Sequence, residues 1–300
     1  MIIVIGSINL DLIGRVSRIP KPGETVPGTL FSTAPGGKGA NQALAARRAG
    51  SKVRMIGAAS KDYFGQQAIA LLEAGDVDLA GVKRLDMPQG VAMIMVDDGG
   101  ENIIGILPGT NAAVTLMDAD AAMRTAQKND VLVVQQEVSQ AVTDHALAMA
   151  GTRGLTTILN IAPFLSTTSS VASRVQYLVA NETEFALLAG RGDLVIQMSN
   201  WAKAHKQTVI VTLGAEGARA ATPDGGQVNV PAFKVVPIDT VGAGDTFVGY
   251  LAAGLEAKYD LAGAMRRAAI AASLACLKRG AQPAIPQVEE VDLALRRGSI

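Results

Sequence analysis

Residues 239–247 (DTVGAGDTF) combine small residues with a carboxylate at the start of a predicted helix. Gly242, Ala243 and Gly244 carry little side-chain bulk, so their N–H groups can approach an anion at the positive end of the helix. A carboxylate beside an anion site is best explained as a base that takes a proton from a nucleophile near a phosphoryl group. Asp245 is therefore expected to be either a catalytic base or, in the plainer interpretation, a helix N-cap.

A second glycine-rich loop, residues 35–42 (PGGKGANQ), also precedes a predicted helix. It matches neither the GxxxxGK[ST] pattern of P-loops nor the GxGxxG pattern of dinucleotide sites, which argues against a dinucleotide-dependent oxidoreductase. The loop offers a tight turn at Gly37 and Gly39 with polar side chains at Lys38 and Asn41. Such groups suit hydroxyl recognition as well as phosphate.

Other polar side chains follow predicted strands. Asn9 and Asp11 come after the first strand, and in an extended segment their side chains point to the same side. An amide and a carboxylate placed in this way can hold two neighbouring hydroxyls, although local turn chemistry is the alternative. Glu137 is a single acid after another strand.

Two further segments stand between a strand and a helix or turn. Residues 181–184 (NETE) carry two carboxylates, which could organise a hydrated Mg²⁺ or simply form the acidic first turn of a helix. Thr212, Gly214 and Gly217 follow one more strand. Together these sites offer hydroxyl-binding groups, two anion loops, a base and metal-organising acids, a combination that predicts phosphoryl transfer to a polyol.

The elements that must position these residues alternate along the chain. Short apolar strands are expected at 1–6, 52–57, 131–135, 157–161, 175–179 and 208–213. Alanine-rich helices are expected at 39–49, 64–74, 118–127, 143–150, 182–189, 246–256 and 261–277, with part of another at 201–205. Continuous apolar strands between helices predict an α/β fold with a doubly wound, mainly parallel sheet flanked by helices.

Two stretches interrupt this alternation. Residues 12–33 contain β-like pieces separated by Pro and Gly, and residues 91–107 predict a hairpin around a Gly-Gly turn. We expect them to form a small β-sheet that acts as a lid beside the cleft, or else a plain extension of the sheet edge. The main domain would then comprise residues 1–11, 34–90 and 108–300.

Composition excludes several classes of protein. The chain has 300 residues, and 27 Lys and Arg balance 27 Asp and Glu, so there is no basic surplus for nucleic-acid binding. One Cys and two His argue against a disulfide framework or a Cys- or His-based metal site. No signal peptide or membrane-spanning stretch is apparent, and we expect a cytoplasmic protein. Glycine is enriched, at 32 residues.

The motifs resemble those of the ribokinases, within the phosphofructokinase-B-type family of sugar and nucleoside kinases. GGKGANQA (36–43) is similar to the N-terminal signature of that family, and DTVGAGDTF (239–247) to its C-terminal signature. GSINLD, GENIIGILPGTNAAVT, NETE, TLGAEG and RGAQPAIP also occur in family order, so the resemblance covers essentially the whole chain.

The resemblance implies ATP-dependent phosphorylation of D-ribose at its 5-hydroxyl, with Mg²⁺, a monovalent cation, usually K⁺, and a homodimer formed through the lid. It implies sugar contacts at Asn9, Asp11, Gly37, Lys38, Gly39, Asn41, Glu137 and Asp245, and nucleotide or Mg²⁺ contacts at Asn181, Glu184, Thr212, Gly214, Gly217 and Gly244. It further implies an anion hole at Gly242, Ala243 and Gly244, a catalytic base at Asp245, and cation ligands at Asp239, Val241, Ala275, Lys278, Gly280 and Ala284.

The chain differs from many ribokinases at two positions, and two other functions are compatible with its motifs. Many ribokinases carry Ser where this chain has Ala284, so a side-chain ligand for K⁺ is missing, and Ala269 replaces a residue that is often polar near adenine. The chain could instead be a related sugar or nucleoside kinase of the same family. A non-catalytic sugar or nucleotide sensor is the alternative from another class, and the presence of Asp245 and both glycine loops argues against it.

Overall fold

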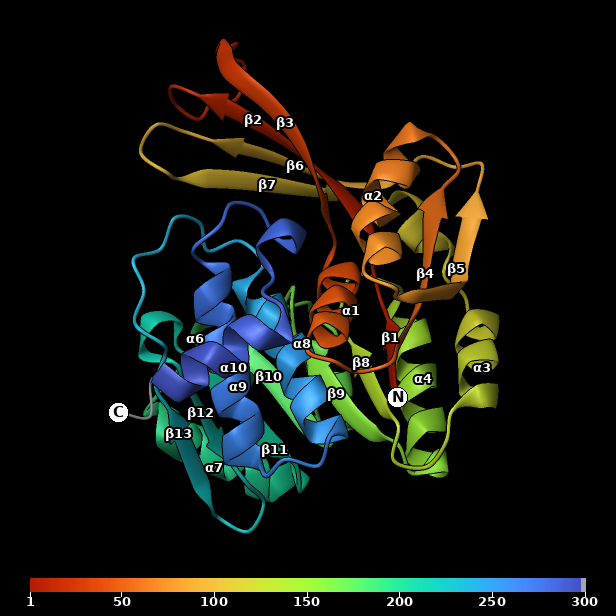
Figure 1. Ribbon diagram of the computed structural model, residues 1–300, viewed down its shortest axis with the longest axis vertical. Coiled ribbons are helices and arrows are strands. Elements are labelled where there is room, and N and C mark those ends of the chain that lie inside the picture. The colour runs from red at the N-terminus through yellow and green to blue at the C-terminus, as the bar shows by residue number, and fades with distance from the viewer. Residues whose placement is uncertain (298–300) are drawn as a thin grey trace.

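Short runs of β-branched and other apolar residues form the centre of a nine-stranded sheet in the computed structural model, which describes residues 1–297 (Figure 1). The strands, in their spatial order, are β13 (Gln227–Val230), β12 (Ala218–Ala221), β11 (Thr208–Thr212), β10 (Tyr177–Asn181), β9 (Thr156–Asn160), β8 (Val131–Val134), β1 (Ile2–Ile5), β4 (Val53–Ser60) and β5 (Asp78–Leu85). All pairings from β11 to β5 are parallel, and the pairings of β12 with β11 and with β13 are antiparallel. The mainly parallel sheet predicted from the sequence is confirmed.

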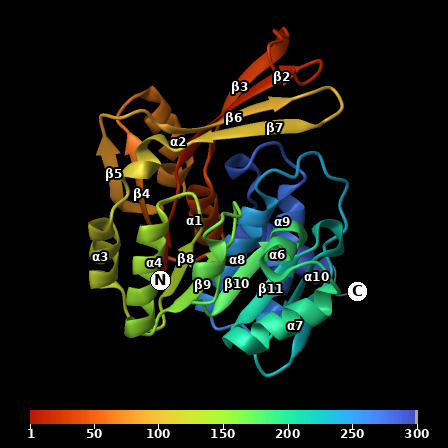
Figure 2. The same cartoon turned by 180° about the vertical axis from the view of Figure 1, so that it is seen from behind.

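Helices cover both faces of this sheet, as Figures 1 and 2 show. One layer contains α1 (Lys38–Arg48), α2 (Tyr63–Ala74), α8 (Ala243–Glu256), α9 (Leu261–Ala275) and α10 (Val288–Arg297). The other contains α3 (Leu116–Thr125), α4 (Gln140–Arg153), α5 (Thr168–Ala172), α6 (Glu182–Ala189) and α7 (Leu194–His205). Alternate side chains of β1 serve the two layers, because Ile2 and Val4 pack into the first and Ile3 and Ile5 into the second.

Helix and strand positions follow the predicted pattern with local differences. Helix α6 has the predicted bounds, but α8 begins at Ala243, three residues earlier than expected, because the small residues of the glycine loop are themselves the first turn. Strand β10 lies two residues later than predicted. The sequence analysis missed β5, β12, β13, α5 and α10. Strands β5 and β13 are the two edges of the sheet, and β12 and α5 have only four and five residues, so their apolar patterning is weak. No helix in the described part of the chain combines the length and the apolar character needed to cross a membrane.

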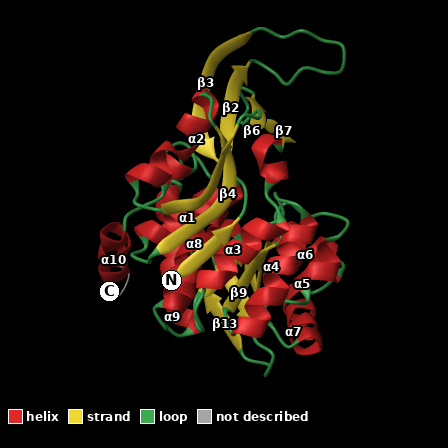
Figure 3. Cartoon of the chain, turned by 90° about the vertical axis from the view of Figure 1, so that its right-hand side faces the viewer, coloured by secondary structure: helices red, strands yellow, loops and turns green. Residues whose placement is uncertain are grey.

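A second sheet of four strands projects from one end of the main body (Figure 3). Its order is β3 (Gly28–Gly36), β2 (Asn9–Val16), β6 (Gly90–Val96) and β7 (Asn102–Leu107). The predicted hairpin is confirmed, since β6 and β7 pair antiparallel. Strand β2 starts only four residues after β1 ends, and its first residue, Asn9, pairs with Gly36. The base of the small sheet therefore joins two of the polar segments found in the sequence. Three 3₁₀ turns complete the fold, η1 (Gly109–Ala113), η2 (Gly214–Glu216) and η3 (Gln282–Ala284).

Candidate active site

Asp245 lies in the first turn of α8 and is buried, with 8% of its surface exposed. It is the third residue of the helix, and the N-cap is Gly242, whose backbone adopts a left-handed φ of 76°. The capping interpretation of Asp245 is therefore wrong. Its carboxylate instead accepts hydrogen bonds from two side chains of α1: Asn41 Nδ2 donates to Oδ2 and Gln42 Nε2 donates to Oδ1, both at 2.9 Å.

Close packing of α1 against α8 brings these groups together. Gly249 lies four residues after Asp245 on the same face of α8. A Cβ at Gly249 would come within 2.4 Å of Ala45 Cβ and 2.6 Å of the Gln42 carbonyl oxygen. The two backbones can therefore approach one another only because this position has no side chain, and that approach places the α1 amides at the carboxylate.

Asn9 and Asp11 both point to one face of β2, as predicted, and both are at least nine-tenths buried. Asn9 Oδ1 accepts a hydrogen bond of 2.7 Å from Asn111 Nδ2, which fixes the amide with its Nδ2 left to donate elsewhere. The Asp11 carboxylate lies over the backbone of Gly36, where a Cβ would come within 2.4 Å of Asp11 Oδ1. Burial, together with the charges of Glu137 and Asp245, raises the pKa of Asp11 to about 7.

Glu137 and Lys38 complete this polar group. Glu137 Oε2 accepts hydrogen bonds from Ser7 Oγ and from the backbone N–H of Lys38, the latter at 3.2 Å. Burial lowers the pKa of the Lys38 ammonium, but the carboxylates of Asp245, Glu137, Glu184 and Asp11 outweigh it, so the pKa is raised overall. Lys38 thus remains a cation among acids from four separate segments.

Asn181 and Glu184 form a capping box at the start of α6. Asn181 Oδ1 accepts from the Glu184 N–H at 2.8 Å, and Glu184 Oε2 accepts from the Asn181 N–H at 3.0 Å. The helix-start interpretation of this segment is therefore correct. Burial raises the pKa of Glu184, while the Asn181 N–H and Lys38 oppose the shift and Asp245 adds to it. These interactions place Glu184 within the electrostatic reach of Asp245 and Lys38.

A cavity of about 490 Å³ opens beside the first turn of α8. It is lined by the predicted nucleotide residues Thr212, Gly214, Gly217 and Gly244, by Ala243, and by Ala269, which the resemblance places near adenine. Further lining residues were not assigned by the sequence analysis, among them Phe233, Val235, Phe247, Ser273 and Cys276. Its size suits a small-molecule ligand. The hydroxyl of Ser273 accepts from the Phe233 N–H at 3.2 Å and donates to the Ala269 carbonyl at 3.0 Å, so it is held by the protein backbone.

The predicted cation residues lie on two loops that the structure places side by side. The Asp239 carboxylate accepts hydrogen bonds from the N–H groups of Val241 at 3.0 Å and Gly280 at 2.8 Å. The Asp239 N–H donates to the carbonyl of Cys276, one residue after Ala275, at 3.2 Å. The second loop also holds Lys278 and Ala284. Arg48 of α1 fixes this loop by donating to the carbonyls of Gln282 and Ile285 at 2.9 and 2.6 Å.

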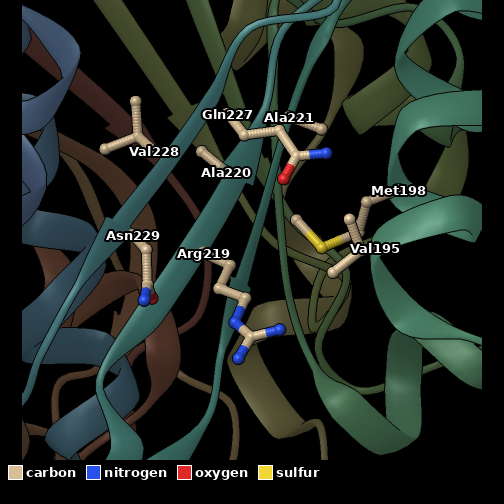
Figure 4. Close-up of a pocket in the computed structure, with 8 residues that line it drawn as sticks. All are labelled: Val195, Met198, Arg219, Ala220, Ala221, Gln227, Val228 and Asn229. Carbon is tan, nitrogen blue, oxygen red and sulfur yellow. The ribbon is translucent and has the colours of Figure 1, made fainter.

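Two other hollows differ from these sites. One of about 330 Å³ lies next to the polar group, between the end of β7 and the loop that carries Glu137. Another, of about 180 Å³, lies between α7 and the β12–β13 hairpin, as Figure 4 shows. Its lining includes Met198, Arg219 and Gln227 and none of the residues singled out in the sequence. We do not connect it with the chemistry.

The supporting residues were the ones that sequence reasoning missed. Asn111 holds Asn9, Ser7 holds Glu137, and Gln42 holds Asp245. Gln42 and Asn111 do lie inside two of the motifs that resemble the family, GGKGANQA and GENIIGILPGTNAAVT. Those motifs were the one sign in the sequence that these residues belong to the site. Their partners are more than 100 positions away in the chain, so no local pattern could assign them.

Comparisons with known proteins show which family the chain resembles. The sequence pattern of the pfkB family carbohydrate kinases matches residues 1–288. A ribokinase from Schizosaccharomyces pombe is 35% identical over 306 residues, covering 97% of this chain and 96% of that protein. A deoxyribokinase from Salmonella typhi is 34% identical over 299 residues, covering 96% of both.

A solved structure shows the same fold. The Arabidopsis thaliana ribokinase complexed with ribose and ATP superposes with a TM-score of 0.88 at 27% identity, covering 98% of each chain. The resemblance seen in the motifs is thus confirmed by sequence and by structure. Because the family pattern spans nearly the whole sequence and relatives above 30% identity cover almost all of it, the chain belongs to the pfkB family of carbohydrate kinases.

Proposed function

We propose that this protein transfers the terminal phosphoryl group of ATP to the 5-hydroxyl of D-ribose, giving ADP and D-ribose 5-phosphate. One observation carries the proposal: Asp245 stands between the polar group on β2 and α1 and the cavity that Ala243 and Gly244 line. A sugar hydroxyl on one side and a phosphoryl group on the other would meet at this carboxylate.

The first turn of α8 supplies both parts of the chemistry. Asp245 would accept the proton of the attacking hydroxyl, a contribution of about 10²–10⁴ in rate. The N–H groups of Gly242, Ala243 and Gly244 at the positive end of the helix would stabilise charge on the transferred group. Both roles are consistent with the burial of Asp245 and with the donors that hold it.

Asn41 supports a sugar-binding role for the second glycine loop. Its Nδ2 is committed to Asp245, and its buried Oδ1 has no hydrogen-bond partner within residues 1–297. An acceptor of this kind is costly to bury unless a ligand donates to it. A sugar hydroxyl bound against the turn of Gly37, Lys38 and Gly39 would satisfy it.

Asn9 and Asp11 favour ribose over 2-deoxyribose. Asn111 donates a hydrogen bond to Asn9 Oδ1, so Asn9 Nδ2 is the group that can donate to a ligand. Asp11 is an acceptor on the same face of β2. Two neighbouring hydroxyls would satisfy both, whereas a sugar lacking one would leave a buried group unpaired. Glu137 would add a further sugar contact. The deoxyribokinase relative makes 2-deoxyribose the competing substrate to test.

ATP would occupy the 490 Å³ cavity beside α8, with Thr212, Gly214 and Gly217 along one wall. Mg²⁺, when bound, would neutralise the phosphates, and Asn181 and Glu184 fit a role in holding its waters because Glu184 reaches Lys38 and Asp245 electrostatically. Phosphate binding through backbone N–H groups and cations explains why a chain without net charge can hold ATP.

A K⁺ ion fits the adjoining loops of Asp239–Val241 and Ala275–Ala284. Within the described residues, no cluster of three or more His, Cys, Asp or Glu could hold a metal, so a cation there would depend on backbone carbonyls. Asp239 ties the loops together through Val241 and Gly280 and would set their spacing. Ala284 offers only its carbonyl.

The small sheet would serve as the lid and as the dimer contact, with residues 12–33 and 91–107 as the lid segments. Its inner face, shared with Asp11, exposes Ile104 and Ile106 by 52% and 44% toward the site. Closure over a sugar would bury these side chains and exclude water that competes for the phosphoryl group. The outer face is also apolar, and this carries the dimer proposal.

ADP production over a panel of sugars and nucleosides tests the function. With ATP and Mg²⁺, and with K⁺ present or absent, we expect ribose to exceed 2-deoxyribose in kcat/KM by on the order of 10²-fold or more. The variant Asp245→Asn should lose turnover by at least about 10²-fold and keep ribose binding, measured by calorimetry. Near-normal turnover of that variant would refute the mechanism, and a higher kcat/KM for another substrate would reassign the activity.

A further inference from the structure

A buried chain of amide side chains runs from the strand ends of the main sheet to Asp245. Gln42 Nε2 donates to Asp245 Oδ1 at 2.9 Å and to Asn160 Oδ1 at 3.1 Å. Gln135, directly after β8, donates from its Nε2 to Gln42 Oε1 at 2.6 Å. Asn160, the last residue of β9, donates from its Nδ2 to the carbonyl of Val179 at 3.3 Å. Both donors and the acceptor of the Gln42 amide are therefore engaged.

The side chain of Gln42 has no contact with solvent, since both Gln42 and Gln135 are 0% exposed. It therefore cannot touch a substrate bound in the cleft. Burying amides in the interior is unfavourable unless every group is paired, so a network of this kind demands a reason beyond packing. Among the described residues, Asp245 is the only charged group to which the Gln42 side chain hydrogen-bonds.

The direction of the hydrogen bonds fixes which end of the Gln42 amide faces the carboxylate. Gln135 presents a donor to Gln42 Oε1, so the Nε2 group of Gln42 must turn toward Asp245 and Asn160. Asn41 then holds the other oxygen of Asp245 from the same helix. With one donor on each oxygen, the plane of the carboxylate is set, and its remaining lone pairs keep a fixed direction.

We propose that Gln42 is a positioning residue for the base Asp245, and that Gln135 fixes the orientation of the Gln42 amide. The inference rests on the proposed role of Asp245 in phosphoryl transfer. A base must lie within hydrogen-bond reach of its proton in a defined direction, and small misplacements reduce the rate sharply. Gln42 would hold the Asp245 carboxylate in that direction from the buried side of the site, without contacting the sugar or the nucleotide.

The variant Gln42→Met tests this role, because Met has a similar length and cannot donate. Its Asp245 carboxylate should turn more freely, because Oδ1 loses its donor. We expect kcat to fall by about 10- to 100-fold with the KM for ribose changed by less than about threefold. Asp11, Lys38 and Glu184, the other charged groups that interact with Asp245, are unchanged in this variant.

Gln207→Met is the matched control. Gln207 is 1% exposed and donates from its Nε2 to the carbonyl of Ala172 at 3.0 Å, in the layer of helices opposite α8. Removing this amide should lower the Tm and leave kcat and KM unchanged. If Gln42→Met does not fold, Gln135→Met carries the test, with a smaller loss of kcat and an unchanged KM for ribose.

The outcomes separate this inference from the proposed function. If Asp245→Asn is inactive while Gln42→Met keeps kcat within twofold of wild type, positioning by Gln42 is overturned and the function stands. If Gln207→Met loses kcat as much as Gln42→Met, the effect is general destabilisation and the inference also fails. If Asp245→Asn keeps full turnover, the proposed function itself fails.

Discussion

Among single residues, Asp11 shows most directly how the site works against the stability of the fold. Its carboxylate is buried beside Glu137 and Asp245, and its pKa rises to about 7. The folded chain therefore binds a proton at Asp11 that the unfolded chain, with an ordinary aspartate, has already released. The free energy of unfolding therefore falls as the pH rises from about 4, near the ordinary pKa of aspartate, to about 7. Above pH 7 this loss of stability is complete.

The variant Asp11→Asn should consequently be more stable than wild type at pH 8. The expected gain is on the order of 2–4 kcal/mol, because each unit of pKa shift corresponds to ~1.4 kcal/mol. The gain should shrink as the pH falls and vanish below about pH 4, where aspartate is protonated in both states. Thermal melts at pH 8 and pH 5 measure this difference.

Asp98→Asn, at the exposed turn between β6 and β7, is the control and should show no such dependence on pH. The Asp11 variant should also bind ribose at least about tenfold more weakly, since it loses a charged acceptor. A variant that is less stable than wild type at pH 8, or equally stabilised at both pH values, would show that Lys38 compensates the buried charge fully.

Among the helices, the contact between α1 and α8 determines how the carboxylate of Asp245, the proposed base, is held. We expect Gly249→Ala to force the helices apart, because its Cβ would lie 2.4 Å from Ala45 Cβ and 2.6 Å from the Gln42 carbonyl oxygen. Overpacking of this kind is destabilising by about 1–3 kcal/mol. Since Gln42 and Asp245 lie on the separated faces, kcat should fall as well. Urea unfolding and steady-state kinetics measure the two effects.

Gly151→Ala is the matched substitution in α4. A Cβ at Gly151 meets nothing within 4 Å, so the change should raise stability by up to about 1 kcal/mol and leave kcat unaltered. If Gly249→Ala is also neutral or stabilising, the helices can repack around a methyl group. The close approach would then not be what holds Asn41 and Gln42 at Asp245.

At the scale of the whole molecule, the outer face of the small sheet is the main apolar surface without a partner in the described chain. Side chains alternate between the two faces of a strand, so the residues whose side chains point away from the Asp11 face share one surface. That surface exposes Phe31 by 67%, Met93 by 51%, Ile103 by 54% and Leu107 by 53%. Contiguous apolar patches of this kind typically mark an interface, and a second copy of the chain is the proposed partner.

Light scattering with size exclusion tests the dimer. Wild type should be a dimer at micromolar concentration, and the double variant Phe31→Lys, Met93→Lys should be a monomer of unchanged secondary structure. Ile196→Lys, at a residue exposed by 60% on α7, should leave the dimer intact. A monomeric wild type, or a dimer that survives the double substitution, would place the contact elsewhere or remove it.

Features that depend on neighbouring residues in the chain could be predicted from the sequence. Apolar strand runs fix a parallel sheet buried on both faces. The small residues of 242–244 fix a close backbone approach at a helix start, and the alternation at Asn9 and Asp11 fixes a shared face. Each depends on neighbours in the chain, so local pattern was sufficient. The same reasoning left Asp245 open between base and cap, because a helix boundary depends on packing.

The hydrogen bonds that hold the site residues in place became visible only in the folded chain. Gln42 reaches Asp245 across 203 positions, and Asn111 reaches Asn9 across 102. These contacts exist because parallel strands bring distant loops to one edge and because Gly249 lets two helices touch. Hydrogen-bond partners of buried amides are chosen by what surrounds them in space. A linear sequence names the donors and acceptors, and only the folded chain decides which of them pair.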